Sequence, residues 1–293
     1  MGRFAPSPTG PLHLGSLVAA VGSSLDAAAR GARWLVRIED LDTTRVIPGC
    51  AATMLATLAA FGFEWDGEVL YQSDRLDAYR HTLAQLRAEQ RTFECSCSRK
   101  TLAETDTQRY PGTCRNGPTA PGVTATRLRA DDTAVVAFHD FFQGQQRIAL
   151  RDLGDVIVRR RDDVPSYQLA VVVDDAWQGI THVVRGHDLL SSTPWQIWLQ
   201  RSLRLPQLHY GHLPLVLEAD GAKLAKSRHA IALDVAHAPA LLHEALRLLA
   251  QQPPAELRRA SIAEIWQWAR AHWQPARIQG RAAVYLSPHS DSF

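Results

Sequence analysis

The sequence RFAPSPTGPLHLGS occupies residues 3–16, and the apolar run LVAAV follows it at residues 17–21. This order predicts the end of a strand, a rigid turn and the start of a helix, because the prolines fix φ and lack an N–H donor while the alanine-rich run is helix-prone. A helix that begins here presents unpaired N–H groups and the positive end of its dipole beside His13 and Ser16. Such a helix end suits a phosphate group. An ordinary loop with a helix cap is the alternative interpretation.

A second stretch, far along the chain, reads KLAKS at Lys223–Ser227 and comes just after the turn signal Asp220-Gly221. Taken alone, two lysines at this spacing are typical of a solvated surface. Together, the two stretches resemble the HIGH and KMSKS signatures of class I aminoacyl-tRNA synthetases, and they come in the same order. The residues RFAPSPTG at 3–10 further resemble the glutamate-specific branch of that class.

Composition places the chain among ordinary globular proteins. Its 293 residues, 46% apolar and 21% charged, are enough for one large or two moderate domains. No apolar run approaches the roughly 18 to 20 residues that a membrane-spanning helix needs, and the N-terminus lacks a signal-peptide core. We therefore expect a cytoplasmic protein with no membrane partner. The net charge of +2 neither supports nor excludes a nucleic-acid partner, because a basic groove can be balanced by acidic surface elsewhere.

The first part of the chain alternates helix and strand patterns. Residues 15–30 predict a helix, 33–38 a strand and 47–61 another helix. The acidic cluster Glu39–Asp42 follows the strand directly. Because the carboxyl ends of parallel strands meet at a ligand-binding crevice, these carboxylates are candidate site residues. Solvation of a loop and capping of the next helix are the alternative.

A later strand pattern, Gly179–Asp188, places Arg185 near its carboxyl end, where a guanidinium can hold a carboxylate in two places. Before it, residues 167–177 form an apolar segment that periodicity alone cannot assign to a helix or a buried strand. The remaining expectations are a helix at 75–90, a connection at 115–130, short strands at 133–139, 146–150 and 156–160, a helix at 189–203 and a helical pattern after 235.

Three of the four cysteines, Cys95, Cys97 and Cys114, lie close together in the sequence. They are too few for a disulfide scaffold and form a candidate tetrahedral zinc site that lacks one ligand. Tyr110 is the most economical fourth ligand, because a phenolate can coordinate and the residue lies just before Cys114. Cys50 or a water molecule could take that place instead. Three buried thiols without a metal are the alternative.

Together these elements resemble the glutamyl-Q tRNA(Asp) synthetase family, shortened relatives of glutamyl-tRNA synthetase. The resemblance covers most of residues 3–230 and depends on several ordered elements, none of which would be enough alone. They are the stretch 3–16, RIEDLD at 37–42, the Cys95 cluster, Tyr167, VRGHD at 184–188 and the stretch 223–227.

The resemblance implies an α/β fold: a Rossmann-like doubly wound parallel sheet with an inserted, zinc-containing subdomain on the acceptor side. Residues 1–75 and 161–235 would be the two halves of the catalytic domain, with residues 76–160 inserted between them. Residues 236–293 would form a short helical C-terminal region. We expect no anticodon-binding domain, and we expect a monomer.

The activity implied by the resemblance is ATP-dependent activation of L-glutamate to glutamyl-adenylate, followed by transfer to queuosine in the anticodon loop of tRNA(Asp). Mg²⁺ would accompany ATP, and Zn²⁺ would be structural. One alternative keeps the chemistry but charges tRNA(Glu). Another is a non-catalytic scaffold that binds tRNA or a nucleotide.

The functional residues of the family carry over to matching positions of this sequence. Two arginines and one acid are the minimum complement for the two carboxylates and one ammonium of glutamate, and Glu39 would hold the ammonium. His13 and Lys226 would stabilise charge that develops on the phosphates. Glutamate is expected against Arg3, Ala5, Ser7, Glu39, Tyr167 and Arg185; ATP against His13, Gly15, Ser16, Lys223, Lys226 and Ser227; and zinc on Cys95, Cys97, Tyr110 and Cys114.

Two positions depart from the signatures. Ser16 stands where the first signature ends in His, and Ala225 stands where the second has its first Ser. Members of the glutamate branch vary at the first position. Ala225 removes one hydroxyl contact but leaves both lysines, so we expect a weakened activity at most.

Overall fold

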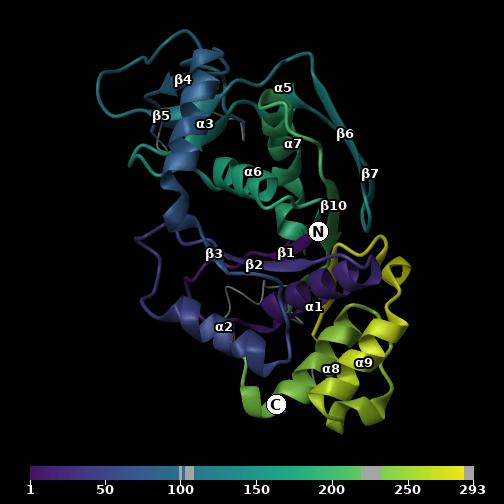
Figure 1. Ribbon diagram of the computed structural model, residues 1–293. Coiled ribbons are helices and arrows are strands. Elements are labelled where there is room, and N and C mark those ends of the chain that lie inside the picture. Colours follow the sequence, from purple (N-terminus) through teal and green to yellow (C-terminus); the bar gives the residue numbers. More distant parts are fainter. Residues whose placement is uncertain (99–100, 103–108, 219–220, 222–231, 287–293) are drawn as a thin grey trace.

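The computed structural model describes residues 1–98, 101–102, 109–218, 221 and 232–286. Parallel strands cross the middle of the molecule, with helices on both sides (Figure 1). One group runs in the order β1 (Gly2–Phe4), β2 (Trp34–Ile38) and β3 (Leu70–Tyr71). The other runs in the order β9 (His182–Gly186), β10 (His209–Leu213), β6 (Val135–Asp140) and β7 (Gly144–Ala149), with only the β6–β7 pair antiparallel.

The two groups of strands meet between β1 and β9. The carbonyl oxygen of Met1 accepts hydrogen bonds from the backbone N–H groups of Thr181, at 3.0 Å, and His182, at 3.1 Å. The strand order therefore reverses beside β1, which is the topological switch point of a doubly wound sheet. This confirms the Rossmann-like α/β fold predicted from the sequence.

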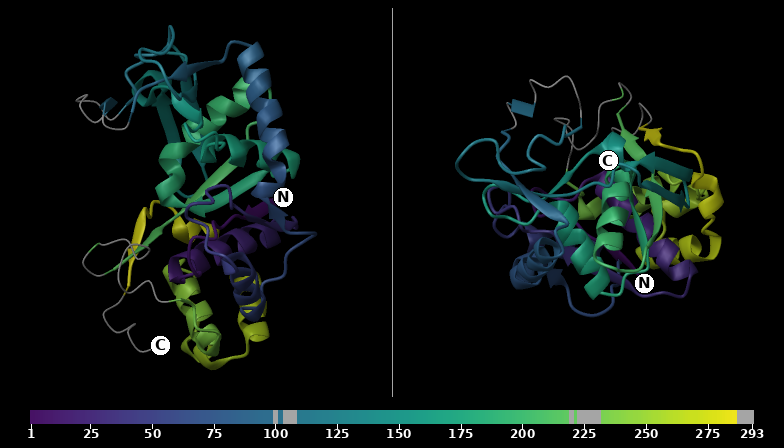
Figure 2. Two further views of the ribbon diagram at one scale, coloured as in Figure 1. Left: turned by 90° about the vertical axis from the view of Figure 1, so that its left-hand side faces the viewer. Right: turned by 90° about the horizontal axis from the view of Figure 1, so that it is seen from above.

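Four helices pack on the side of the sheet that carries α1. They are α1 (Leu14–Ala29), α2 (Cys50–Ala60), α8 (Ala238–Leu248) and α9 (Ile262–His272). Their apolar faces share one buried cluster, and the views of Figure 2 agree in placing α8 and α9 beside α1. Gly22 allows α1 to lie directly on β10, since a Cβ at this position would come within 2.5 Å of Leu213 Cδ1.

On the other side lie α3 (Leu76–Ala88), α6 (Tyr167–Trp177) and α7 (Thr193–Ser202). The segment 167–177, which periodicity left open, is thus a helix, and the hydroxyl oxygen of Ser166 caps it by accepting from Leu169 N at 3.4 Å. A second buried cluster joins α3, α6 and α7 through Leu83, Val171 and Leu199.

A small antiparallel sheet lies beside α3 in the upper part of Figure 1, formed by β4 (Thr92–Cys95), β5 (Ala125–Leu128) and β8 (Val156–Arg159). The prediction that residues 115–130 are only a connection is therefore wrong at β5. The pattern of this strand is hidden because two polar residues, Thr126 and Arg127, are buried in it. Strands β6 and β7 also fall within 76–160, although they pair into the parallel sheet. The division of the chain into domains stays a prediction.

A separate two-stranded sheet forms after α9, in which β12 (Ala283–Tyr285) pairs in parallel with β11 (Leu215–Leu217). Earlier in the chain, the short helix α5 (Leu150–Leu153) follows β7. Across the described ranges, every helix is too short or too polar to cross a lipid bilayer.

Candidate active site

A cavity of about 780 Å³ opens at the carboxyl ends of β1 and β9, at the topological switch point. Its lining includes every described residue that the sequence assigned to glutamate or ATP: Arg3, Ala5, Ser7, His13, Gly15, Ser16, Glu39, Tyr167 and Arg185. Lys223, Lys226 and Ser227 lie outside the described residues. The fold therefore brings residues from distant parts of the sequence into one space, while their individual roles stay predictions.

Arg3 is held at the wall of the cavity by a buried carboxylate of α6. Its Nε and Nη2 donate to the two oxygens of Asp175 at 3.1 and 3.3 Å, and both side chains are almost fully buried. Burial alone would raise the pKa of Asp175, but the charges of Arg3 and Arg37 outweigh it and hold that pKa below its usual range. Asp175 is therefore ionised and fixes Arg3 in two places.

Arg37 lies beneath this pair and is fully buried. Its Nη1 donates to Asp175 and to Gln178, both at 2.8 Å, and its Nη2 lies 3.3 Å from Glu39 Oε1. Burial is opposed by the charges of Asp175 and Glu39, which raise the pKa of Arg37. Arg37 thus links the carboxylate that holds Arg3 to the carboxylate that faces the cavity.

Glu39 follows β2 and faces the cavity with most of its side chain buried. Burial raises the pKa of Glu39, and the charges of Arg37 and Arg3 oppose that shift only in part. A cationic group in the cavity would favour the ionised form. The position therefore suits the ammonium of an amino acid.

Arg185, at the end of β9, is held by groups from several elements. Its Nε lies 3.1 Å from His212 Nε2, its Nη1 donates to Tyr167 Oη at 3.2 Å, and its Nη2 donates to Thr193 Oγ1 at 2.8 Å. Its side chain is 5% exposed and still lines the cavity. A buried guanidinium in a fixed orientation is suited to binding a carboxylate.

His13 is the cap of the helix that starts at the cavity. Its Nδ1 accepts from Ser16 N at 3.3 Å, so this N–H is not left unpaired as the sequence suggested. Gly15 makes room for the ring, because a Cβ there would lie 3.1 Å from His13 Nδ1. The imidazole therefore occupies the helix N-terminus itself, and the positive end of the α1 dipole remains directed at the cavity.

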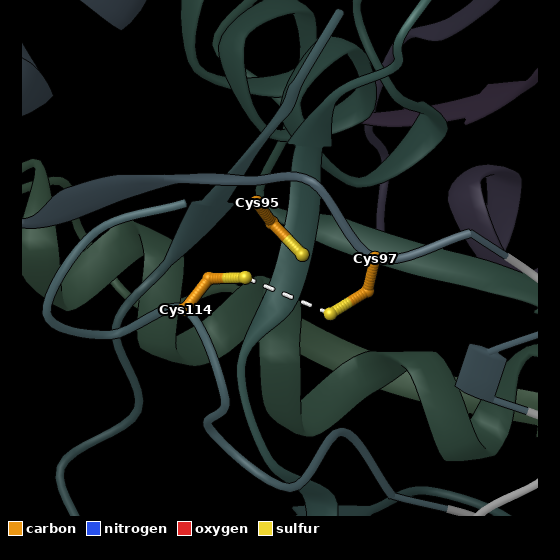
Figure 3. A group of neighbouring side chains, drawn as sticks. All are labelled: Cys95, Cys97 and Cys114. Carbon is orange, nitrogen blue, oxygen red and sulfur yellow. Dashed lines mark hydrogen bonds between the residues drawn. The ribbon is translucent and has the colours of Figure 1, made fainter. Parts of the chain in front are cut away.

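The cysteine cluster lies at the small antiparallel sheet, away from the cavity. The sulfur atoms of Cys95, Cys97 and Cys114 all lie within 4.8 Å of one another, and Figure 3 shows them turned toward a common point. Thiolates around a tetrahedral zinc, each at about 2.3 Å from the ion, lie about 3.8 Å apart. The sulfur atoms of Cys97 and Cys114 lie 3.6 Å apart, so this cluster fits a metal ion such as zinc.

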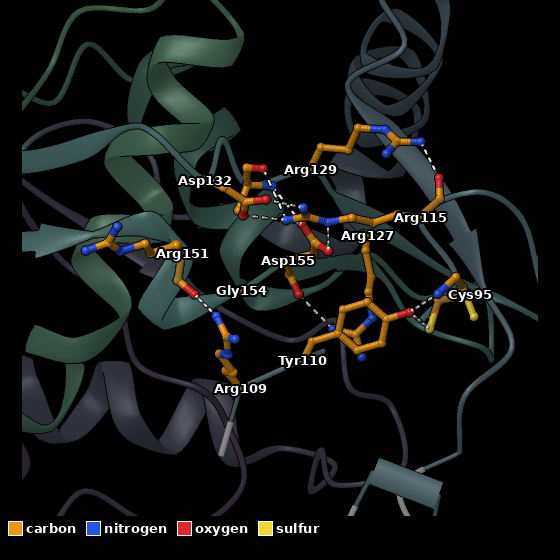
Figure 4. A network of polar contacts seen from close by, with 12 residues as sticks. Cys95, Arg109, Tyr110, Arg115, Arg127, Arg129, Asp132, Arg151, Gly154 and Asp155 are labelled. Atoms are coloured by element: carbon orange, nitrogen blue, oxygen red, sulfur yellow. Dashed lines mark hydrogen bonds and ion pairs between the residues drawn. The ribbon is translucent and has the colours of Figure 1, made fainter. Parts of the chain in front are cut away.

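Tyr110 brings its phenol oxygen to the same place (Figure 4). This oxygen lies 3.5 Å from Cys95 Sγ and 4.0 Å from Cys97 Sγ, and it accepts from Cys114 N at 2.7 Å. Arg127 lies over the ring at 3.8 Å and fixes its orientation. The phenol oxygen therefore lies beside the three sulfur atoms, and its role as a fourth ligand stays a prediction.

Cys50, the other candidate for the fourth position, lies elsewhere. It begins α2, is buried in the main core, and its thiol donates to the carbonyl oxygen of Gly10 at 3.2 Å. The possibility that Cys50 completes the cysteine cluster is therefore excluded by its position.

The thiols of the cluster differ in acidity. Burial raises the pKa of Cys114, but hydrogen bonds from Tyr110, Ser96 and Thr119 outweigh burial and lower this pKa to about 5. Burial raises the pKa of Cys97 to about 11, and its contact with Cys114 adds to the rise. Cys114 is thus the more acidic of these two thiols, and a bound cation would favour the thiolate form of its ligands.

The sequence did not predict the buried residues that position the predicted site residues. Asp175 lay inside a segment whose secondary structure was open, and Arg37 was noted only as part of the strand. Asp140 and His212 carried no motif at all. The only available signal was that Asp174 and Asp175 interrupt a buried apolar run, where charged groups need partners.

Comparison with known proteins agrees with this geometry. The family described as "tRNA synthetases class I (E and Q), catalytic domain" matches residues 1–249. A protein of Dechloromonas aromatica named glutamyl-Q tRNA(Asp) synthetase is 54% identical over 97% of this chain and 97% of its own length. A protein of the same name from Pseudomonas fluorescens is 52% identical over 97% of this chain and 95% of its own length.

Solved structures share the fold. A glutamate tRNA ligase from Elizabethkingia meningosepticum, crystallised with its amino acid, superposes with a TM-score of 0.78 at 22% identity. The match covers 97% of this chain and 66% of that chain. A glutamate-tRNA synthetase from Elizabethkingia anophelis gives a TM-score of 0.79 at 22% identity and covers 98% of this chain and 68% of that one. From the family match and the close relatives together, the chain belongs to the class I tRNA synthetase family for E and Q, in the branch formed by the glutamyl-Q tRNA(Asp) synthetases.

Proposed function

We propose that this protein activates L-glutamate with ATP and transfers the glutamyl group to queuosine in the anticodon loop of tRNA(Asp). The observation that carries the proposal is the cavity at the switch point, in which two buried arginines and one carboxylate face the same space. The relatives that are about half identical over nearly the full chain bear the name of this activity.

In this proposal, glutamate binds at the end of the cavity formed by β1, β2 and α6. Arg3 and Arg185 take its two carboxylates, and Glu39 takes its ammonium. Both arginines are fixed by buried partners, so the binding site needs little rearrangement before the substrate arrives. The remaining contacts come from Ala5, Ser7 and Tyr167, which line the same end.

ATP binds beside the N-terminus of α1, against His13, Gly15 and Ser16, with Lys223, Lys226 and Ser227 on its phosphates. An oxygen of a glutamate carboxylate attacks the α-phosphorus, the bond from that phosphorus to the bridging oxygen breaks, and pyrophosphate leaves. No protein nucleophile is required. His13, the helix dipole and Lys226 stabilise the charge that develops on the phosphates, and Mg²⁺ bound with ATP would neutralise part of it.

The glutamyl group is then transferred at the same site. A hydroxyl of the cyclopentene-diol of queuosine attacks the carbonyl carbon of glutamyl-adenylate, an ester bond forms, and AMP leaves. We further propose that the protein works as a cytoplasmic monomer on tRNA(Asp). Zinc bound by Cys95, Cys97, Tyr110 and Cys114 would be structural and would order the small sheet.

The test is transfer of labelled glutamate by the purified protein to tRNA(Asp) with queuosine, tRNA(Asp) without queuosine and tRNA(Glu). We expect label only on the queuosine-containing tRNA(Asp). Label on tRNA(Glu) would overturn the choice of acceptor and support ordinary charging. Label on none of the three, together with no glutamate-dependent ATP–pyrophosphate exchange, would overturn the proposal of an enzyme.

A further inference from the structure

We propose that Asp140 and His212 are positioning residues that hold the Arg185 guanidinium in the orientation needed to bind a carboxylate of the amino acid. The inference depends on the proposed function of the cavity, because it concerns the same substrate. Both side chains are fully buried, at 0% exposure, so they act on the substrate only through Arg185.

The three residues form a row across three neighbouring strands. Asp140 ends β6, which pairs with β10 at Tyr210, and His212 on β10 is in register with Arg185 on β9. Paired residues of a parallel sheet point to the same face. The row therefore runs from the interior of the sheet to the cavity, and each residue contacts the next.

Asp140 is a carboxylate that only accepts hydrogen bonds. Its Oδ1 accepts from the backbone N–H groups of Phe142, Gln143 and His212, each at 3.0 Å, and its Oδ2 lies 2.5 Å from His212 Nδ1. Burial would raise the pKa of Asp140, but His212 and these backbone donors outweigh it and lower the pKa. An ionised Asp140 requires that His212 Nδ1 carries the proton.

The proton on Nδ1 determines whether the other ring nitrogen, Nε2, donates or accepts. In a neutral imidazole whose Nδ1 is protonated, Nε2 has a lone pair and accepts. The Nε of Arg185 lies 3.1 Å from it and can only donate. Burial lowers the pKa of His212 to about 4, in agreement with a neutral ring near pH 7. The opposite tautomer would place two N–H groups against each other inside the protein.

With Nε held by His212, the other two nitrogens of Arg185 also point at defined acceptors. Its Nη2 donates to Thr193 Oγ1 at 2.8 Å and to the carbonyl oxygen of Leu189 at 3.3 Å, and its Nη1 donates to Tyr167 at 3.2 Å. Within the described residues, one N–H of Nη1 has no protein acceptor. Because the guanidinium is planar, fixing Nε fixes the direction of that last donor.

The arrangement has a consequence for affinity. A guanidinium only donates, and the free N–H of Nη1 can donate to an oxygen of the substrate carboxylate. If His212 no longer anchors Arg185, the guanidinium can rotate away from this orientation. Glutamate should then bind more weakly.

The experiment compares two substitutions of His212. His212→Asn keeps an N–H near the position of Nδ1 for Asp140 but removes the acceptor for Arg185, whereas His212→Gln can return an oxygen near the position of Nε2. Titration calorimetry should show L-glutamate binding weakened roughly 10- to 100-fold in His212→Asn, the effect of one hydrogen bond to a charged group, and partly restored in His212→Gln. ATP binding should not change. His209→Asn, an exposed residue on the same strand, is the control and should bind glutamate as the parent does.

A second measurement tests, without substrate, whether His212 Nε2 can accept a hydrogen bond from Arg185. A long-range ¹H–¹⁵N spectrum of the parent protein should show His212 protonated at Nδ1, and Asp140→Asn, whose side chain can donate, should move the proton to Nε2. Glutamate affinity in His212→Asn equal to that of the parent would overturn the inference, as would a parent ring protonated at Nε2. If the parent binds no glutamate at all, the proposed function fails and the spectrum alone decides the tautomer.

Discussion

The end of the cavity that we assign to glutamate and the cysteine cluster are both buried polar sites, but they are completed in different ways. At the cavity, charges from β1, β2 and α6 neutralise one another, with Asp175 between Arg3 and Arg37. In the cysteine cluster, three thiols and a phenol face one another, and a cation would complete the set. The fold therefore preorganises the first site before any ligand binds, whereas the second site would be completed by a bound cation.

The largest expected effect of a single substitution is at the centre of the preorganised site. Asp175→Asn leaves Arg3 and Arg37 buried without a full counter-charge, and breaking a buried ion pair typically costs about 3 to 5 kcal/mol of the free energy of unfolding. Denaturant unfolding measures this cost. Asp77→Asn removes an exposed ion pair and should change the same free energy by about 1 kcal/mol or less. Equal effects of the two substitutions would contradict the view that Asp175 balances a preorganised, buried charge network.

The second-largest effect is expected for Glu39→Ala, which should impair the use of glutamate while the fold is retained. It removes the carboxylate that we assign to the substrate ammonium, while Arg37 keeps its bond to Asp175. Glutamate-dependent ATP–pyrophosphate exchange should fall by about 10²- to 10³-fold, the typical cost of one such electrostatic contact, and ATP binding should be retained. The exposed Glu68→Ala serves as the control. An unchanged glutamate dependence in Glu39→Ala would defeat the assignment.

Glu39 and Asp175 also show how much of the site the sequence could predict. Glu39 was predicted because it directly follows a strand whose pattern is local, at RIED. Asp175 was not, because its partners Arg3 and Arg37 lie more than a hundred residues away in sequence and the secondary structure of 167–177 was open. The alternating patterns predicted the first helices and strand, and the doubly wound parallel sheet was expected from the family resemblance. Strand β5 was missed because its buried residues Thr126 and Arg127 are polar and are satisfied only by tertiary contacts.

Loss of a metal from the cysteine cluster should disturb the structure around the cluster more than it weakens glutamate binding. The cysteine cluster has its own small core, separate from the cluster of apolar residues behind the cavity. Cys114→Ser, or treatment with a chelator, should therefore lower the metal content and the thermal midpoint while leaving glutamate affinity within about twofold of the parent. Metal analysis by mass spectrometry and glutamate titration check both parts.

Tyr110→Phe tests the fourth ligand within the cysteine cluster. It keeps the ring beneath Arg127 but removes the phenol oxygen, so zinc retention during dialysis should fall with little change in packing. Zinc retention equal to that of the parent would show that Tyr110 is not a ligand. A lost glutamate affinity in either metal-site variant would mean that the two sites are coupled, contrary to their separate cores.

The pH dependence of glutamate binding tests the ionisation of Glu39. Because burial raises the pKa of Glu39 in the free protein, the carboxylate begins to take up a proton at a higher pH than an ordinary glutamate side chain, whose pKa is about 4.3. The substrate ammonium favours the ionised form, so the complex has the lower pKa and binding below the free pKa releases a proton. Affinity should therefore decline as pH falls through the raised pKa, by up to tenfold per pH unit. Glu39→Gln cannot titrate at this position, so its weaker binding should lose this slope, and a slope retained in Glu39→Gln would assign the titration to another group.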